Sequence, residues 1–140
     1  MLIHATTVDI AGAGVLLMGS SGAGKSDLAL RLILDGALLV SDDQTVLSIE
    51  GESVRAHAPT SIEGLIEARG VGLLRVPTVS RSHVRMVVLL VSELTERLPE
   101  PQFWKPPHLE KPRLPCVEIV GREASASVKL RLALHAVLKA

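Results

Sequence analysis

Residues 19–26 read GSSGAGKS, and their types and order suit them to binding phosphate groups. They match the pattern G-x-x-x-x-G-K-[ST] at every fixed position. Glycines let successive backbone N–H groups surround an anion at a helix N-terminus, and the lysine adds a positive charge for the β- and γ-phosphates. The serine hydroxyl that ends the motif suits Mg²⁺. The segment predicts a site for ATP and Mg²⁺ made by Gly19, Ser20, Ser21, Gly22, Ala23, Gly24, Lys25 and Ser26.

The elements around this segment are those that a phosphate-binding loop requires. Residues 14–18 form a continuous apolar run, which predicts a strand buried on both faces. After the loop, Leu28, Leu32 and Ile33 recur at helical spacing. Gly36 then stands where a helix stop is expected. Because a strand, a glycine-rich turn and a helix follow one another, we prefer a phosphate-binding loop to a glycine-rich turn with an incidental lysine.

Two adjacent carboxylates, Asp42 and Asp43, follow the next predicted strand, residues 37–41. A parallel α/β sheet would place this strand end beside the phosphate-binding loop. One carboxylate there could hold the Mg²⁺ shell, and the other could take a proton from an attacking hydroxyl. Side chains alternate along a strand, so the two are expected to face different surroundings. The alternative is an acidic turn after a strand, which the phosphate-binding loop makes the weaker interpretation.

A second pair of charged residues, Glu67 and Arg69, stands just before the Gly70-Val71-Gly72 sequence. Such a pair can belong to a loop over a ligand, or it can mark a helix C-terminus with its stabilising cation. Both interpretations stay open on the residues alone.

The remaining elements follow from apolar patterning and turn residues. A capping box at residues 60–63 predicts a short helix that residues 69–72 break. The strand-turn-helix-strand order at the front implies a right-handed parallel crossover. The expected fold is α/β: one P-loop-containing domain over residues 1–140, with a mixed β-sheet flanked by helices. Its other predicted parts are a hairpin at a sheet edge (45–50 and 53–57), strands at 73–76, 84–91 and 116–120, a proline-rich loop at about 99–115 and a helix at about 124–138.

The only aromatic side chains, Phe103 and Trp104, are adjacent in the proline-rich loop. They either anchor an interface or pin the loop to the core. The C-terminal helix, in which Lys129 and Arg131 stand beside leucines, is either a partner-binding surface or an ordinary amphipathic cover.

The composition limits the possible partners. Fifteen basic and fifteen acidic residues cancel, so the net charge favours neither a nucleic acid nor an anionic membrane. The longest apolar run, residues 86–91, is far below the roughly 18 residues of a membrane-spanning helix. The single cysteine, Cys116, excludes an intrachain disulfide, and no signal-peptide pattern opens the chain. We therefore expect a cytoplasmic protein that acts on neither nucleic acid nor membrane.

Taken together, His4, residues 19–26, the Ser-Asp-Asp sequence at 41–43 and the Glu-Ala-Arg-Gly-Val-Gly sequence at 67–72 resemble the catalytic domain of the HPr kinase/phosphorylase family. Their order and spacing are similar to those of the family. The resemblance implies the short, proteobacterial form of the enzyme, which lacks the family's N-terminal domain.

The resemblance also implies roles for single residues. The family's active-site histidine precedes the phosphate-binding loop by the interval seen for His4. The second aspartate of its V-A-D-D segment, here Asp43, accepts a proton during phosphorylation and returns it in the reverse reaction. The glutamate of its E-I-R-G-x-G signature, here Glu67, joins Ser26 as a ligand of Mg²⁺. A catalytic arginine in a D-R-L-like context corresponds to Arg97. Additional candidates are Asp42 and Arg69.

The implied reaction is transfer of the γ-phosphate of ATP to a serine of the phosphocarrier protein HPr, with Lys25 and Mg²⁺ offsetting the developing charge. A phosphate-dependent reverse reaction, which releases pyrophosphate, is a further implication. The R-P-G-R-N segment that the family associates with it is replaced here by residues 120–124, Val-Gly-Arg-Glu-Ala. Family members assemble as hexamers, so a homo-oligomer is expected.

Two rival functions stay in view. A small-molecule kinase would use the same phosphate-binding loop, but it usually carries an arginine-rich lid, and no such cluster is seen. A regulatory module that binds ATP without transferring phosphate belongs to a different class of protein. The presence of a candidate base, Asp43, argues against that class.

Overall fold

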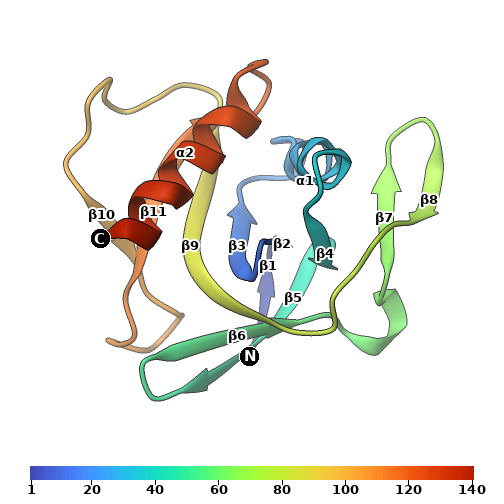
Figure 1. The fold of residues 1–140 in the computed structure, drawn as a ribbon, viewed down its shortest axis with the longest axis horizontal. Coiled ribbons are helices and arrows are strands. Elements are labelled where there is room, and N and C mark those ends of the chain that lie inside the picture. The colour runs from blue at the N-terminus through green and yellow to red at the C-terminus, as the bar shows by residue number, and fades with distance from the viewer.

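The computed structural model describes all 140 residues, which form a strongly curved mixed sheet with two helices packed on one side of it (Figure 1). The main sheet has nine strands, and a two-stranded hairpin stands apart from it. The main-sheet strands are β1 (Leu2–His4), β2 (Thr6–Ile10), β3 (Ala13–Met18), β4 (Leu38–Ser41), β5 (Gln44–Glu50), β6 (Ser53–His57), β9 (Ser82–Val91), β10 (Gln102–Trp104) and β11 (Leu114–Val120). The other elements are helices α1 (Lys25–Leu34) and α2 (Ala126–Lys139), the 3₁₀ turn η1 (Thr60–Ile62) and the hairpin strands β7 (Leu65–Ala68) and β8 (Gly72–Arg75).

The strand that precedes the phosphate-binding loop, β3, lies at the centre of the sheet. It pairs in parallel with β9, which in turn pairs in parallel with β11. On its other side, β3 pairs antiparallel with β2, and β2 pairs antiparallel with β4. The crossover through α1 therefore joins two strands that run in the same direction, as predicted, but β2 lies between them.

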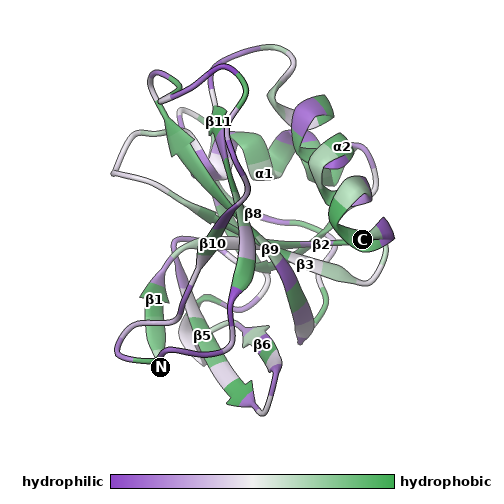
Figure 2. Cartoon of the chain, turned by 90° about the vertical axis from the view of Figure 1, so that its left-hand side faces the viewer, coloured by the Kyte–Doolittle hydropathy of each residue, from purple (hydrophilic) through white to green (hydrophobic).

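Strand β3 is buried on both faces because two apolar clusters meet the sheet there. Val15 and Leu17 belong to the cluster beneath α1 and α2, whereas Leu16 belongs to the cluster enclosed by the opposite side of the curved sheet. Helix α2 carries both hydrophobic and hydrophilic residues (Figure 2), and it buries Ala126 and Leu130 against the first cluster. This arrangement confirms the predicted α/β fold with a mixed sheet and flanking helices.

The predicted hairpin of residues 45–57 is confirmed as the antiparallel pair β5–β6. Its predicted place at a sheet edge is wrong. Strand β1 covers the outer side of β5, and β6 pairs with β9. The edge strand β1 has only three residues, and its partners could not be read from so short a segment.

The helix predicted after residue 60 is also wrong. The chain makes only the 3₁₀ turn η1, and the side chain of Thr60 forms no capping bond. Gly64 then takes a φ of 80°, and residues 65–68 continue as strand β7. In this strand Ile66 and Ala68 are buried while Glu67 is exposed, an alternation with the period of a strand.

The proline-rich loop contains a strand that its prolines concealed. Strand β10 pairs antiparallel with β11, so residues 99–115 are not loop throughout. Trp104 packs against the second apolar cluster. The ring of Phe103 is half exposed, and the guanidinium of Arg113 lies 4.4 Å from its centroid. Neither α1 nor α2 has the length and apolar character needed to cross a membrane.

Candidate active site

The phosphate-binding loop connects β3 to α1 and leaves the start of the helix open. Gly24 is the N-cap residue of α1, with a φ of 99°, and no side chain caps the helix. The backbone N–H groups of the first turn are therefore available to an anion. Gly19 allows a close approach on the other side: a Cβ there would lie 2.9 Å from the carbonyl oxygen of Leu90 in β9. A larger residue would push the loop away from the sheet.

The side chain of Lys25 is nearly buried, with 7% of its surface exposed. Its Nζ donates to the carbonyl oxygens of Gly19 and Ser20, at 3.0 and 3.2 Å. The ammonium group is thus held inside the curve of the loop, where the phosphates of a nucleotide would lie.

The carboxylate of Asp42 accepts hydrogen bonds from three separate segments of the site. The hydroxyl of Ser26 donates to its Oδ1 at 2.7 Å, and the hydroxyl of Thr6 donates to the same oxygen at 3.1 Å. The backbone N–H of Glu67 donates to Oδ2 at 3.0 Å. Asp42 is 8% exposed, so these three donors replace most of its contact with water. One buried carboxylate therefore joins the phosphate-binding loop, strand β2 and the β7–β8 hairpin.

Asp43 faces solvent instead, as the alternation of side chains predicts. Its backbone takes a φ of 66°, in the left-handed region that aspartate tolerates better than most residues. Nε2 of His4 lies 3.2 Å from its Oδ1, and both side chains are more than half exposed. Residues 39 positions apart in the sequence are thereby paired at the end of β4.

The hairpin β7–β8 forms one wall of a cavity of about 570 Å³ above the phosphate-binding loop. In Figure 1 it stands beside α1 and β4, apart from the main sheet. Buried Ile66 packs it into the first apolar cluster, and Leu39 of β4 hydrogen-bonds to Pro77 and Val79 of the chain that follows it. The cavity is lined by Ser21, Gly22, Gly24, Lys25, Ser26, Asp27, Leu30, Asp42, Asp43, Glu67, Ala68, Arg69 and Val71.

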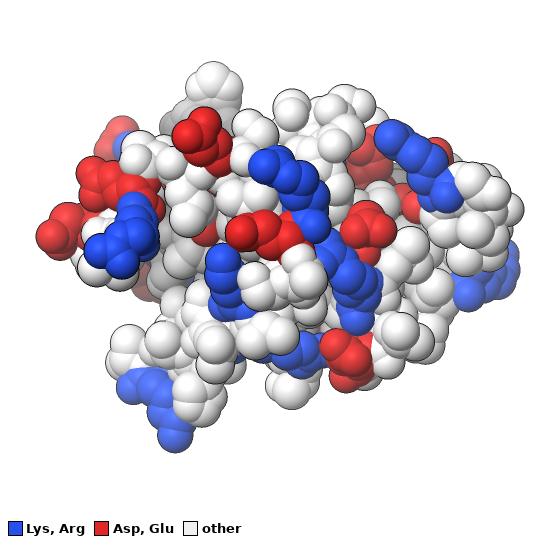
Figure 3. Space-filling model, turned by 90° about the horizontal axis from the view of Figure 1, so that it is seen from above, with Lys and Arg blue, Asp and Glu red and all other residues white.

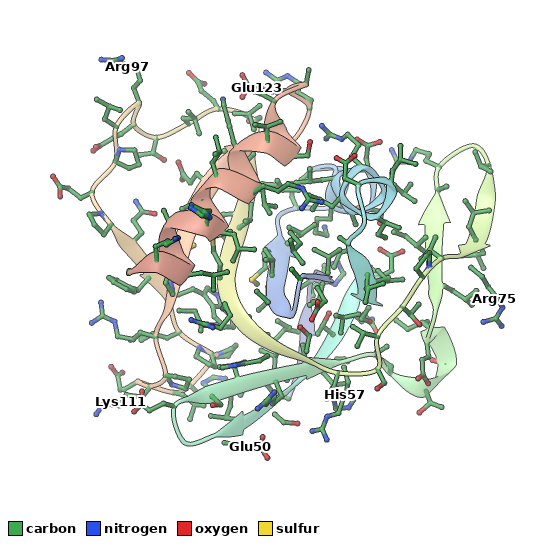
Figure 4. The ribbon with its side chains drawn as sticks, viewed as in Figure 1. Glu50, His57, Arg75, Arg97, Lys111 and Glu123 are labelled. Atoms are coloured by element: carbon green, nitrogen blue, oxygen red, sulfur yellow. The ribbon has the colours of Figure 1, made fainter.

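Most of the residues predicted for the site meet at this cavity. Lys25, Ser26, Asp42, Asp43, Glu67 and Arg69 all line it, and His4 reaches it through Asp43. Arg97 does not line it. That residue lies on the exposed loop after β9, and in Figure 4 its side chain points away from the molecule, on the far side of α2 from the hairpin.

Comparison with known proteins shows to which family the chain belongs. The family model described as the HPr Serine kinase C-terminal domain matches residues 1–97. The chain belongs to this family. Every predicted site residue lies within the matched segment, with Arg97 at its end.

Named relatives of this chain support its assignment to the HPr serine kinase family. The HPr kinase/phosphorylase of Bacillus pumilus is 41% identical over 101 residues, which are 68% of this chain and 33% of that protein. The enzyme of the same name from Bordetella pertussis is 38% identical over 109 residues, 69% of this chain and 35% of that protein. The chain thus spans about a third of the length of these relatives. The Hpr(Ser) kinase/phosphatase structure from Coxiella burnetii has the same fold, with a TM-score of 0.80 at 24% identity, over 99% of this chain and 92% of that one.

Two parts of the site were not predicted from the sequence. Thr6 has no motif around it, and its contact with Asp42 comes only from the pairing of β2 with β4. The other is the loop after β11, which lies outside the family match. Arg31 of α1 donates to the carbonyl oxygens of Gly121 and Glu123, and a Cβ at Gly121 would lie 2.9 Å from the carbonyl oxygen of Ala23. This loop therefore supports the phosphate-binding loop from behind.

The residues at the cavity suit a magnesium–nucleotide complex. No three histidine, cysteine, aspartate or glutamate side chains are close enough to hold a metal ion alone. Mg²⁺ usually takes one or two protein oxygens and completes its shell with phosphate oxygens and water. Ser26 and Glu67 both line the cavity and carry such oxygens. Acidic and basic side chains are interspersed on the face that is seen when the molecule of Figure 1 is viewed from above (Figure 3).

The two clearly shifted ionisable groups lie away from the cavity. Burial lowers the pKa of His83, and the charges of Arg55 and Arg85 lower it further. Burial raises the pKa of the Cys116 thiol to about 11, and Glu118 contributes to the rise. The thiol is therefore protonated and unreactive at neutral pH.

Replacing Ser26 by alanine tests the oxygen donor beside Asp42. We expect Ser26→Ala to raise the Mg²⁺ concentration for half-maximal ATP-dependent activity about tenfold or more, because the hydroxyl and its bond to Asp42 are both lost. Ser26→Thr, which keeps the hydroxyl and satisfies the motif, should stay within about threefold of the wild type. A magnesium titration of the initial rate measures both. Equal behaviour of the two variants would contradict a role for the hydroxyl.

Proposed function

We propose that this chain is an ATP-dependent protein kinase domain that phosphorylates a serine of an HPr-like phosphocarrier protein. The observation that carries the proposal is the position of Asp43, an exposed carboxylate at the rim of a cavity whose floor is the phosphate-binding loop. A hydroxyl presented from outside can reach Asp43 while ATP fills the cavity. The printed names of the relatives supply the identity of the phosphate acceptor.

In this proposal the floor of the cavity holds and orients the phosphates. The open N-terminus of α1 and the ammonium of Lys25 bind the β- and γ-phosphates. Ser26 donates its proton to Asp42 and so turns a lone pair of its oxygen toward the cavity. Glu67 offers a second oxygen from the hairpin wall. Bound Mg²⁺ would neutralise part of the charge that develops on the transferred group.

Transfer of the seryl proton takes place at the rim of the cavity, where Asp43 lies. Asp43 accepts the proton of the seryl hydroxyl as the seryl oxygen attacks the γ-phosphorus, the bond from the γ-phosphorus to the bridging oxygen breaks, and ADP leaves. His4 contacts the same carboxylate and restrains its orientation. Arg69 lines the cavity as a cation that can offset charge on the transferred group, whereas Arg97 would need its loop to move before it could contribute.

The reverse reaction is a second candidate because the relatives' names include a phosphorylase. Inorganic phosphate would attack the phosphorus of phosphoserine, the seryl oxygen would take a proton from Asp43, and pyrophosphate would leave. The same phosphate-binding loop would hold the attacking phosphate. The departure from the family at residues 120–124 makes this direction the one to measure separately.

Incubation with γ-labelled ATP, Mg²⁺ and purified HPr tests the proposal. We expect label on a serine of HPr. Label on a small molecule from a metabolite extract, with none on HPr, would replace the proposal by a small-molecule kinase. ATP binding without transfer to any acceptor would replace it by a regulatory module. Adding phosphate to phosphoserine-HPr and measuring pyrophosphate decides the reverse reaction.

The proposal also covers the cellular compartment and the oligomeric state of the protein. We expect the reaction in the cytoplasm, which suits a protein that uses ATP and carries one unpaired cysteine. We also expect a homo-oligomer, as in the family, which sedimentation of the purified chain would detect.

A further inference from the structure

Thr6 joins the two aspartates of the site through one hydroxyl group. The residue lies on β2, between the central strand β3 and the edge strand β4, and its exposure is 0%. Its Oγ1 donates to Oδ1 of Asp42 at 3.1 Å and accepts from the backbone N–H of Asp43 at 3.0 Å. The donor and the acceptor capacity of this buried hydroxyl are therefore both used on neighbouring residues of one turn.

The turn that Thr6 holds needs support. Asp43 takes a left-handed backbone conformation, in which the Cβ of a residue other than glycine crowds the following carbonyl oxygen. The turn is also closed locally: the N–H of Gln44 donates to the carbonyl oxygen of Asp42 at 2.7 Å, and the hydroxyl of Ser41 donates to that of Gln44. Only Thr6 ties the turn to another strand through the N–H of Asp43 itself. This bond fixes the direction in which the Asp43 side chain leaves the backbone.

The next residue along the strand, Thr7, provides a natural comparison. It is equally buried, and its side chain points to the opposite face of β2. Its Oγ1 lies 2.8 Å from Oγ1 of Thr45, whose own proton goes to the carbonyl oxygen of Ala5 at 2.9 Å. Thr7 is therefore the donor in a buried hydroxyl pair that touches neither aspartate. Replacing either threonine by valine removes one buried hydroxyl from the same strand.

We propose that Thr6 is a positioning residue of the phosphotransfer site, which orients Asp42 through its proton and Asp43 through its oxygen. This inference rests on the proposed kinase function. Thr6 does not line the cavity, so it acts through Asp42 and Asp43. Without its hydroxyl, Asp42 loses one of its three donors, and the left-handed turn loses the bond that aims Asp43 at the rim of the cavity.

The kinetic test compares Thr6→Val, Thr6→Ser and Thr7→Val in the intact chain with ATP, Mg²⁺ and HPr. We expect Thr6→Val to lower kcat roughly tenfold to a hundredfold, the effect of a small displacement of catalytic groups. The KM values for ATP and HPr should stay within about threefold, because the phosphate-binding loop is untouched. Thr6→Ser, which keeps the hydroxyl, and Thr7→Val should both retain a kcat within about threefold of the wild type. Equal losses in Thr6→Val and Thr7→Val, or an equal loss in Thr6→Ser, would overturn the inference.

A spectroscopic measurement decides the inference separately from the proposed function. The Hε1 resonance of His4, assigned by its absence in His4→Gln, reports the contact with Asp43. We expect it to move in Thr6→Val and to remain unchanged in Thr6→Ser and Thr7→Val. An unchanged resonance in Thr6→Val would refute the positioning role. If the wild type fails to phosphorylate HPr, the proposed function is wrong, and this resonance still decides whether Thr6 positions Asp43. If Thr6→Val does not fold, Thr6→Ala, which also removes the hydroxyl, takes its place in both measurements.

Discussion

Replacing Lys25 by methionine should lower kcat/KM for phosphate transfer by about a thousandfold or more. Methionine keeps a long apolar stem in the nearly buried position and removes the ammonium group that the loop carbonyls hold. A single cation on the transferred group is worth roughly 10³–10⁵ in rate in phosphotransfer enzymes. Because the same cation also binds the ground-state phosphates, we expect ATP affinity to fall as well, by about tenfold. Initial rates with labelled ATP and calorimetric titration with MgATP measure the two effects.

A matched control for this variant is Lys105→Met. Lys105 is an exposed lysine that pairs with Glu110 at 3.2 Å on the proline-rich segment, away from the cavity. The Lys105→Met substitution removes one positive charge from the chain and leaves the phosphate-binding loop intact, so kcat/KM should stay near that of the wild type. If the two variants lose activity to the same extent, the ammonium of Lys25 does not act on the phosphates.

Replacing Asp43 by asparagine should reduce kcat by about 10²–10⁴, the range that a general base contributes. Asparagine has the same shape and also tolerates the left-handed backbone, so the turn should persist. It cannot accept the seryl proton. ATP affinity should stay within about threefold, because Asp43 lies at the rim and not on the floor of the cavity. Rapid-quench measurement of phosphoserine formation in the ATP-saturated enzyme isolates this step.

The control for Asp43 is the exposed aspartate Asp35, which follows α1 and makes no contact with the cavity. Asp35→Asn removes the same charge and should leave kcat unchanged. Full activity of Asp43→Asn would show that Asp43 is not the group that takes the seryl proton. A loss of ATP binding would instead show that Asp43 belongs to the nucleotide site.

The elements that the sequence predicted correctly are those whose apolar residues follow one period without interruption. Strand β3 is a run of apolar residues that stops before Gly19. Helix α1 buries Leu28, Ala29 and Leu32 on one face and ends two residues before Gly36. Strand β2 was not predicted because all of its residues are buried although three of the five, Thr6, Thr7 and Asp9, are polar. Their partners lie in the turn after β4, in β5 and in β9, which are distant in sequence. Local patterning cannot supply such partners.

The same distinction applies to the site. The phosphate-binding loop is one continuous segment, so its geometry could be expected from its own residues. The place of His4 in the site was implied only by the family, and its pairing with Asp43, which depends on the meeting of β1 with β5, was not predicted. The residues alone left Glu67 either in a loop over a ligand or at a helix C-terminus, whereas the structure puts it in strand β7, at the cavity and just before the turn at Gly70. The three-way sharing of Asp42 needed the structure itself.

The hairpin β7–β8 forms one wall of the cavity, and the carboxylate of Asp42 helps to hold it in place. Two strands of four residues are not stable by themselves in water. Their attachment depends on buried Ile66, on the backbone bonds of Leu39 and on the N–H of Glu67 that Asp42 accepts. Local opening of this unit, of the kind that amide hydrogen exchange detects, would remove Glu67 and Arg69 from the cavity at once while the phosphate-binding loop stays folded. Replacement of Asp42 by alanine would favour that opening, so the hairpin wall and the floor of the site are energetically coupled through the Asp42 side chain.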